Sequence, residues 1–143
     1  MTEANVALID AAEGVLSPHR LAPGQLCGDV GAALISGAGR MFRGVCLDTA
    51  SGTGFCAEAS AIAAMVTAGE YRIARIVAVA RDDAGRLLVL PPCGRCREFI
   101  RQMHPANLDA EVVLGWDRAV SLRTLLPETD WPAPLPERPL ATG

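Results

Sequence analysis

The stretch CAEASAIAAMVTAGEYRIARIVAVA, residues 56–80, contains both kinds of element from which we expect the fold to be built. Its first half places apolar residues at helical spacing and ends at Gly69, which predicts a helix over residues 56–68. Residues 75–80 form a short apolar run of the kind that makes a buried strand. A helix followed by a buried strand is typical of α/β proteins.

Helical and strand patterns alternate on both sides of this stretch. Helices or single helical turns are predicted at residues 3–16, 93–103 and 122–126. Strands are predicted at residues 30–35, 41–47, 111–114 and 119–120, and the first two form a hairpin. This alternation predicts one three-layer α/β/α domain over residues 1–127. Residues 128–143 are rich in proline, so we expect an extended tail that packs on this domain or on a neighbouring subunit.

Length and composition exclude several classes of protein. The chain has 143 residues, the size of one domain, and 50% of them are hydrophobic, which excludes intrinsic disorder for most of its length. The net charge of −3 and the aromatic content of 4% argue against binding to nucleic acid or to a membrane surface. No apolar run approaches the roughly 18 residues that a membrane-spanning helix needs. We therefore expect a compact domain with neither nucleic acid nor membrane as its partner.

The chain has five cysteines, an odd number, and its N-terminus lacks the basic and apolar regions of a secretory signal peptide. We therefore expect a cytoplasmic protein whose thiols stay reduced. In that compartment, clustered cysteines indicate metal binding or redox chemistry rather than a framework of disulfide bonds.

Three of the cysteines lie in two short segments, Cys56-Ala57-Glu58 and Pro92-Cys93-Gly94-Arg95-Cys96, and each segment begins a predicted helix. Thiolates are preferred ligands of Zn²⁺, and three protein ligands plus a water are the pattern of a catalytic zinc site. Cys93 and Cys96 are three residues apart and so face the same side of their helix. The backbone N–H groups at a helix start favour the thiolate form. The cluster therefore predicts one Zn²⁺ held by Cys56, Cys93 and Cys96.

Glu58 follows Cys56 by two residues, close enough to reach a water at the metal without binding the metal itself. A ligand two residues before a glutamate, followed later by Pro-Cys-x-x-Cys, is the layout of zinc-dependent deaminases, which allow three cysteine ligands. We therefore predict that Glu58 is the catalytic acid–base group. Three thiolates leave the zinc centre negatively charged, and we expect the two helix N-termini and Arg95 or Arg97 to offset that charge.

Two other interpretations of the cluster are open at this point. A structural zinc site would need a fourth ligand, which Cys27 or Cys46 would have to supply. A redox dithiol would use Cys93 and Cys96 at the start of a helix, as thioredoxin-like proteins do. The third thiol and Glu58 favour the catalytic site over both, and Cys27 and Cys46 are more typical of small buried side chains.

With these segments the sequence resembles the cytidine deaminase family, and within it most of all the blasticidin-S deaminases. The resemblance covers about residues 28–131. The matching segments are Gly44-Val45, Cys56-Ala57-Glu58, Pro92-Cys93-Gly94-Arg95-Cys96-Arg97, His104-Pro105 and Leu125-Leu126-Pro127. The resemblance implies a central five-stranded mixed sheet, one Zn²⁺ per subunit, and a homotetramer with shared active sites. It also implies hydrolytic deamination of a cytosine nucleoside, which is cytidine, deoxycytidine or a blasticidin-S-like analogue.

The resemblance assigns roles to residues around the zinc site. Glu58 would move a proton from water to the ring nitrogen and then protonate the departing ammonia. Backbone groups beside Ala57 and Pro92 would bind the amide edge of the ring. In related enzymes a Trp or Phe shortly after Leu-Leu-Pro closes over the base, and here that residue is Trp131.

The chain departs from the family where the sugar is expected to bind. Small cytidine deaminases carry Asn-x-Glu on the second hairpin strand to hold the ribose hydroxyls, and this chain has Cys46-Leu47-Asp48. We predict that Asp48 faces the pocket mouth and binds a substrate hydroxyl or amine; the alternative is that Asp48 caps the turn beginning at Thr49. The departure leaves open a deaminase of another aminated ring, such as a modified cytosine or a purine-type base. A non-enzymatic zinc-binding module is the alternative outside the family.

Overall fold

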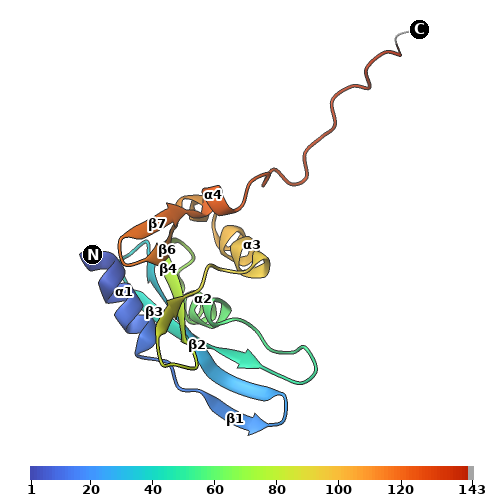
Figure 1. The fold of residues 1–143 in the computed structure, drawn as a ribbon. Helices are drawn as coiled ribbons and strands as arrows, with labels where there is room; N and C mark the ends of the chain where they lie inside the picture. Colours follow the sequence, from blue (N-terminus) through green and yellow to red (C-terminus); the bar gives the residue numbers. More distant parts are fainter. Residues whose placement is uncertain (142–143) are drawn as a thin grey trace.

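The computed structural model describes residues 1–141 of the chain. Its single sheet has seven strands: β1 (His19–Ala22), β2 (Gln25–Ser36), β3 (Met41–Asp48), β4 (Ile73–Arg81), β5 (Leu87–Val89), β6 (Glu111–Gly115) and β7 (Arg118–Ser121). The helices are α1 (Glu3–Glu13), α2 (Ala57–Thr67), α3 (Gly94–Met103) and α4 (Leu122–Leu125), with one 3₁₀ helix, η1 (Pro105–Asp109). Figure 1 shows these elements along the chain.

The sheet is organised around β2. Strands β3 and β4 both pair antiparallel with β2. The same residues of β2 pair with residues of both strands, so β3 and β4 lie along opposite edges of β2. Strand β6 then pairs parallel with β4, and β7 pairs antiparallel with β6. Five strands therefore lie in the order β3-β2-β4-β6-β7, with β1 beside the start of β2 and β5 beside the end of β4. This mixed sheet confirms the predicted α/β class.

The prediction of five strands is wrong in number, because β1 and β5 add two to the five that the patterns predict. These strands are four and three residues long, which is too short to show a strand pattern in the sequence. Strand β2 also begins at Gln25 instead of residue 30, because residues 23 and 24 form a tight hairpin turn between β1 and β2. The first helix ends at Glu13, three residues before its predicted end.

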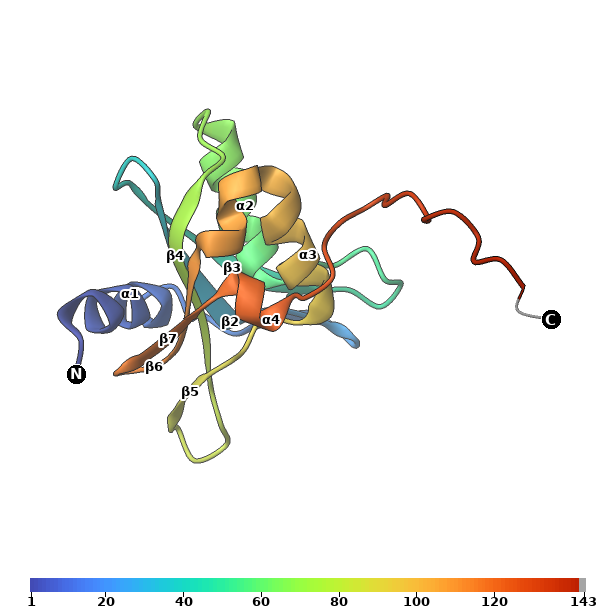
Figure 2. The ribbon, with the colours of Figure 1, turned by 90° about the horizontal axis from the view of Figure 1, so that it is seen from above.

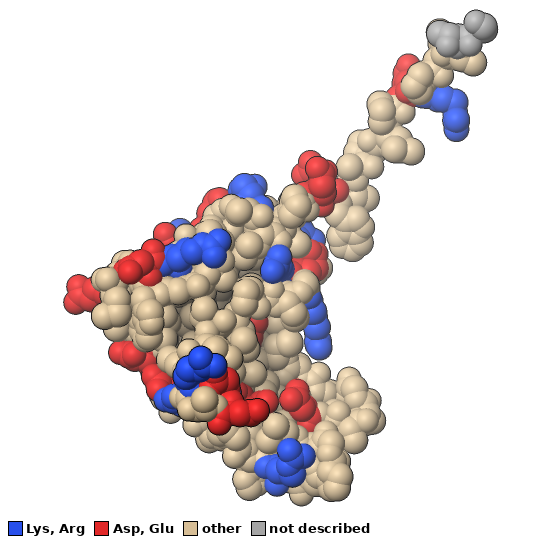
Figure 3. Space-filling view, viewed as in Figure 1, with Lys and Arg blue, Asp and Glu red and all other residues tan. Residues whose placement is uncertain are grey.

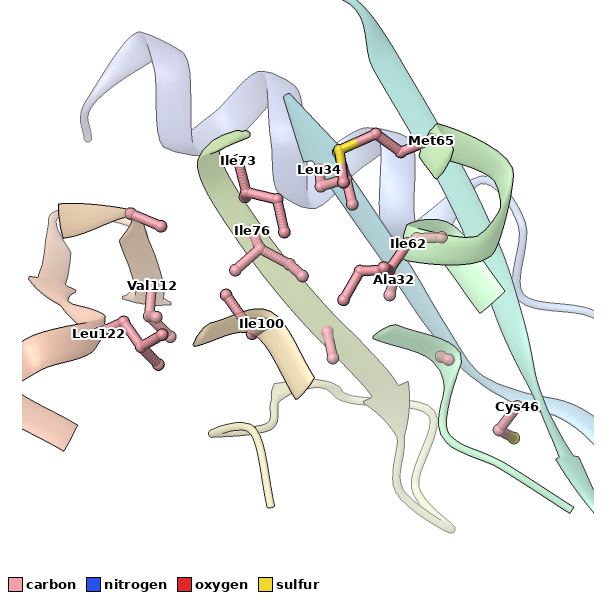
Figure 4. Packing of buried hydrophobic residues seen from close by; sticks show 14 residues of the cluster. Ala32, Leu34, Cys46, Ile62, Met65, Ile73, Ile76, Ile100, Val112 and Leu122 are labelled. Carbon is pink, nitrogen blue, oxygen red and sulfur yellow. The ribbon is translucent and has the colours of Figure 1, made fainter. Parts of the chain in front are cut away.

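The core has two layers of apolar side chains, one on each face of the sheet. Figure 2 shows α1 on one face of the sheet and α2 and α3 on the other. Ala33 and Val77 pack with α1 on one face. Ala32 and Ile76 pack on the other face with α2 and α3, as Figure 4 shows. Neighbouring residues of a strand point to opposite faces of the sheet, so each central strand supplies both layers. This arrangement confirms the predicted three-layer α/β/α architecture.

The contact between α2 and β3 determines where the first turn of α2 lies. A side chain at Gly44 would place its Cβ 2.4 Å from the Cβ of Ser60 and 2.5 Å from the backbone nitrogen of Ala61. Glycine at this position therefore lets the helix approach the strand closely. The Ser60 hydroxyl then donates a hydrogen bond of 2.6 Å to the carbonyl of Val45. Both contacts lie within one turn of the residues that begin α2.

The surface in Figure 3 carries acidic and basic side chains interspersed with each other, without a broad basic patch on the face shown. Within residues 1–141, none of the helices combines the length and the apolar character that crossing a membrane requires.

The proline-rich tail extends away from the domain after α4 (Figures 1 and 2). Its large apolar side chains are almost fully in solvent: Trp131 is 78% exposed, Leu135 92% and Leu140 94%. Residues 142 and 143 of the predicted tail lie outside the described residues. In the single chain the described part of the tail leaves its own domain, and its packing on a neighbouring subunit stays a prediction.

Candidate active site and metal centre

Three cysteine sulfurs meet where α2 and α3 begin. Cys56 is the N-cap of α2, Cys93 is the N-cap of α3, and Cys96 lies in the first turn of α3. The three Sγ atoms lie within 4.8 Å of one another, and those of Cys56 and Cys93 are 3.8 Å apart. Tetrahedral ligands about 2.3 Å from a Zn²⁺ ion are about 3.8 Å from each other. The donor set and its spacing therefore fit one zinc ion.

The start of α3 stabilises the thiolate of Cys93. Burial alone would raise the pKa of Cys93, but the backbone N–H groups of Cys96 and Arg95, together with neighbouring sulfurs, lower it below its ordinary value. Burial raises the pKa of Cys56 and of Cys96, and the nearby Glu58 carboxylate adds to the effect on Cys96. Of the three thiols, Cys93 is therefore the one whose thiolate form the start of α3 favours.

The carboxyl group of Glu58 lies beside the sulfur cluster in the first turn of α2. Only 6% of this residue is exposed, and that burial raises its pKa above the ordinary value. Its own backbone N–H and the thiol of Cys96 form hydrogen bonds that partly oppose the rise. A rise in pKa brings a carboxyl closer to the range in which it can both accept and donate a proton, which is the property that an acid–base catalyst needs.

A pocket of about 550 Å³ opens in front of these groups. Its lining includes Cys56, Glu58 and Cys93 from the cluster, and Asp48 and Thr49 from the end of β3 and the loop that follows. Apolar wall residues are Val30, Leu47, Phe55 and Leu90. This volume lies in the range of small-molecule sites, which are about 300–1,000 Å³ and mostly apolar with a few converging polar groups. The pocket is therefore the place where a substrate would meet the metal.

The other residues predicted to bind substrate lie in three different places. Ala57 lines the pocket. Pro92 does not; it lines a small cavity behind Glu58, and its neighbour Pro91 lines the substrate pocket instead. Trp131 lies in the tail and is not among the residues around the pocket of its own chain.

The two arginines beside the cysteines differ in their contacts. Arg95 is exposed and lines the pocket, where its charge can act on the sulfur cluster. The guanidinium group of Arg97 instead donates hydrogen bonds to the carbonyls of Pro92 at 2.8 Å and of Leu125 at 3.0 Å. Arg97 therefore ties the start of α3 to α4, and a direct part in balancing the thiolate charge stays a prediction.

Sequence reasoning did not assign a role to Asp29, which contacts the pocket wall through Cys46. The Cys46 thiol donates a hydrogen bond of 2.7 Å to Oδ1 of Asp29, and Cys46 itself lines the pocket. A glycine next to Asp29 in an otherwise apolar strand is the only sequence feature that hints at an irregular backbone there. Neither Cys27 nor Cys46 belongs to the sulfur cluster, so the described residues supply three metal ligands and not four.

Comparisons with known proteins agree with this geometry. Residues 19–112 match the family model described as the cytidine and deoxycytidylate deaminase zinc-binding region. The chain belongs to the cytidine deaminase family. A curated relative, the cytidine deaminase of Halalkalibacterium halodurans, is 35% identical over 108 residues, which are 75% of this chain and 73% of the relative.

Solved structures of cytidine deaminases have the same fold. The crystal structure of the enzyme from Mycobacterium tuberculosis matches with a TM-score of 0.69 at 26% identity, over 90% of this chain and 97% of that chain. The enzyme from Burkholderia pseudomallei matches with a TM-score of 0.68 at 30% identity, over 90% of this chain and 98% of that chain. The chain is therefore a zinc-dependent hydrolase of this family, and the redox dithiol and structural zinc interpretations are wrong.

Purified protein is expected to contain about one equivalent of zinc per chain, as a three-cysteine catalytic site requires. Cys93→Ala and Cys96→Ala should each lower the zinc content sharply, because two thiolates hold the ion poorly. Metal analysis by plasma emission measures this, with Cys27→Ala as the matched control because Cys27 lies outside the cluster. Full zinc occupancy in both cluster variants would remove these residues from the ligand set.

Proposed function

We propose that the protein catalyses the hydrolytic deamination of a cytosine nucleoside. The substrate is cytidine, deoxycytidine or an analogue with a modified sugar, a class that includes blasticidin-S-like compounds, and the products are the uracil compound and ammonia. The observation that carries the proposal is the buried carboxyl of Glu58 beside three clustered thiols, at a pocket that Glu58, Cys56 and Cys93 line. All five cysteines carry free thiols, which supports a reducing cytoplasm as the place of action.

The residues of the chain divide the chemistry among them. Cys56, Cys93 and Cys96 would hold Zn²⁺, which acts when bound as a Lewis acid that makes water acidic near neutral pH. The Glu58 carboxylate takes a proton from the attacking water and holds it on a carboxyl oxygen. The water oxygen bonds to the ring carbon that carries the amino group, and Glu58 delivers the proton first to the ring nitrogen. Glu58 then takes the second proton from the hydroxyl now on that carbon and delivers it to the amino group, so that the carbon–nitrogen bond breaks, ammonia leaves and the hydroxyl oxygen becomes the carbonyl of the product.

Glu58→Gln is expected to keep the zinc and the fold but to lose about 10²–10⁴-fold in turnover, because an amide cannot carry the proton. The measurement is ammonia release from cytidine, deoxycytidine, blasticidin S, cytosine and aminated purines by both proteins. A variant within a few-fold of the wild type on the best substrate would contradict the assignment of Glu58. Faster release of ammonia from an aminated purine than from the cytosine compounds would instead assign the activity to another aminated ring.

Asp48 is proposed to bind the part of the substrate that lies beyond the ring. It lines the pocket, and the turn after it is capped by Thr49, whose hydroxyl accepts a hydrogen bond of 3.0 Å from the backbone N–H of Thr53. Because Thr49 performs the capping, the alternative role of Asp48 as the cap loses its support.

Asp48→Asn is expected to cost about 1–3 kcal/mol in kcat/KM, the size expected when a charged hydrogen bond is weakened. The cost should shrink for a substrate that lacks the contacted group, and the melting temperature should change little. Steady-state kinetics with cytidine, deoxycytidine and free cytosine measure both quantities. An equal loss on all three substrates that follows a lower melting temperature would show a structural role instead.

We also propose that the protein acts as a homotetramer in which the tail of one subunit reaches a neighbour. The exposed apolar side chains of the tail support this, since they lack partners within the described part of their own chain. A second, apolar cavity of about 450 Å³ between α2 and α3 shares Phe55 and Arg95 with the substrate pocket, which gives a neighbouring subunit a surface beside the site.

Light scattering is expected to show a tetramer, and Trp131→Ala should lower kcat/KM without changing the zinc content. Co-expression of Trp131→Ala with Glu58→Gln tests the origin of the tail. The Glu58→Gln subunit supplies an intact tail, and the Trp131→Ala subunit supplies an intact pocket. The activity of the mixed assembly should therefore exceed the sum of the activities of the two variants measured separately. A monomer, or activity equal to the sum, would contradict the shared site.

A further inference from the structure

Arg97 holds the backbone on both sides of Cys93. Its backbone N–H donates a hydrogen bond of 3.0 Å to the carbonyl of Cys93, as the first turn of a helix requires. Its guanidinium Nε donates a hydrogen bond of 2.8 Å to the carbonyl of Pro92, the residue before the N-cap of α3. One residue therefore binds both peptide groups that flank the Cα of Cys93, and these groups determine where the Cys93 sulfur points.

Packing does little to hold this part of the chain. Cys93 is exposed, and a Cβ at Gly94 would meet no other described part of the chain within 4 Å. Cys96, by contrast, is buried in the first turn of α3. The position of the Cys93 sulfur therefore depends on hydrogen bonds to its backbone more than on burial.

The guanidinium group of Arg97 is braced by α4, which lies beside α3 (Figure 2). Its Nη1 donates a hydrogen bond of 3.0 Å to the carbonyl of Leu125, the last residue of α4. Carbonyls at the end of a helix, and the carbonyl before an N-cap, have no partner within the helix. Arg97 binds one of each kind, and its planar group keeps the two donors in a fixed relative direction.

Arg97 binds neutral carbonyls and no carboxylate. Among residues 1–141 it forms no ion pair, whereas Arg101, one turn further along α3, pairs with Glu98. Both side-chain hydrogen bonds of Arg97 are partly buried, which limits competition from water. These contacts favour a role in holding the backbone over the predicted role in offsetting the thiolate charge.

We propose that Arg97 is a positioning residue of the zinc site, which holds the Cys93 sulfur where all three sulfurs can bind one ion. The same contact orients the segment before α3, in which Pro91 lines the substrate pocket. Groups that hold a metal ligand in place without touching the metal typically contribute about 10–100-fold to metal affinity or activity. The inference concerns the metal centre and does not depend on which substrate the pocket binds.

The experiment measures zinc affinity by competition with a chromophoric chelator, which needs no substrate. Arg97→Met keeps an unbranched stem without donors, and we expect it to bind zinc about 10–100-fold more weakly than the unchanged protein. Arg97→Lys keeps the charge but lacks the planar pair of donors, so it should recover less than half of that loss on a logarithmic scale. Arg101→Met is the matched control on the same helix and should bind zinc like the unchanged protein, because Arg101 pairs with Glu98.

Cobalt in place of zinc reports the geometry of the site. Co²⁺ bound by thiolates absorbs visible light, and its absorption bands depend on how the ligands are arranged. At saturating cobalt the spectrum of Arg97→Met should differ from the spectra of the unchanged protein and of Arg101→Met. A loss of general stability alone would lower the melting temperature of the metal-free protein without altering that spectrum. With saturating zinc, Arg97→Met should lower kcat on the best substrate and change KM little.

Zinc affinity of Arg97→Met within twofold of the unchanged protein, or an unaltered cobalt spectrum, would overturn the role of Arg97. Recovery of more than half of the loss by Arg97→Lys would overturn it too, because the charge alone would then suffice. If Arg97→Met does not fold, Arg97→Lys carries the test: weaker zinc binding with an altered cobalt spectrum supports the role, and unchanged values overturn it. A protein that binds zinc as expected but releases ammonia from no cytosine compound would contradict the proposed function and leave this inference standing.

Discussion

The structure depends on holding three mutually repelling thiolates at one point. Cys56, Cys93 and Cys96 can stay close only if positive charge is supplied, by the metal ion and by backbone N–H groups where two helices begin. The two helix starts must therefore meet. For α2 this is achieved by its close approach to β3 across Gly44, and for α3 by Arg97, which binds carbonyls on both sides of the helix start.

Burial changes the pKa of the groups around the sulfur cluster. It raises the pKa of Cys96 and of Glu58, because removal from water disfavours the charged form of each side chain. The same burial makes Glu58 a suitable carrier of a proton, since its carboxyl can hold one and release it. At the wall of the pocket, Asp29 is partly buried and Asp48 is exposed, so burial acts less on these two carboxylates.

The catalytic part of the site could be predicted from the sequence because it is local. Cys56-Ala57-Glu58 and Pro92–Cys96 each lie at the start of one helix, where the spacing along the chain is also the spacing in space. The remaining contacts are not local. Asp29 reaches Cys46 only because β2 bulges, and Pro91 instead of Pro92 lines the pocket because of how the segment before α3 runs past it.

The sequence by itself determined the alternation of helices and strands and the α/β class, and it predicted the candidate metal ligands and acid–base group. The helices and strands follow from periodicity within about a dozen residues, whereas the candidate ligands and acid–base group follow from two short segments that match the layout of zinc-dependent deaminases. Only the tertiary structure decided that β1 and β5 join the sheet, that Arg97 binds carbonyls of Pro92 and Leu125, and that two carboxylates meet beside Cys46. Such contacts depend on strand register and on helix approach, which are set by packing between residues far apart in the chain and leave little trace in any single segment.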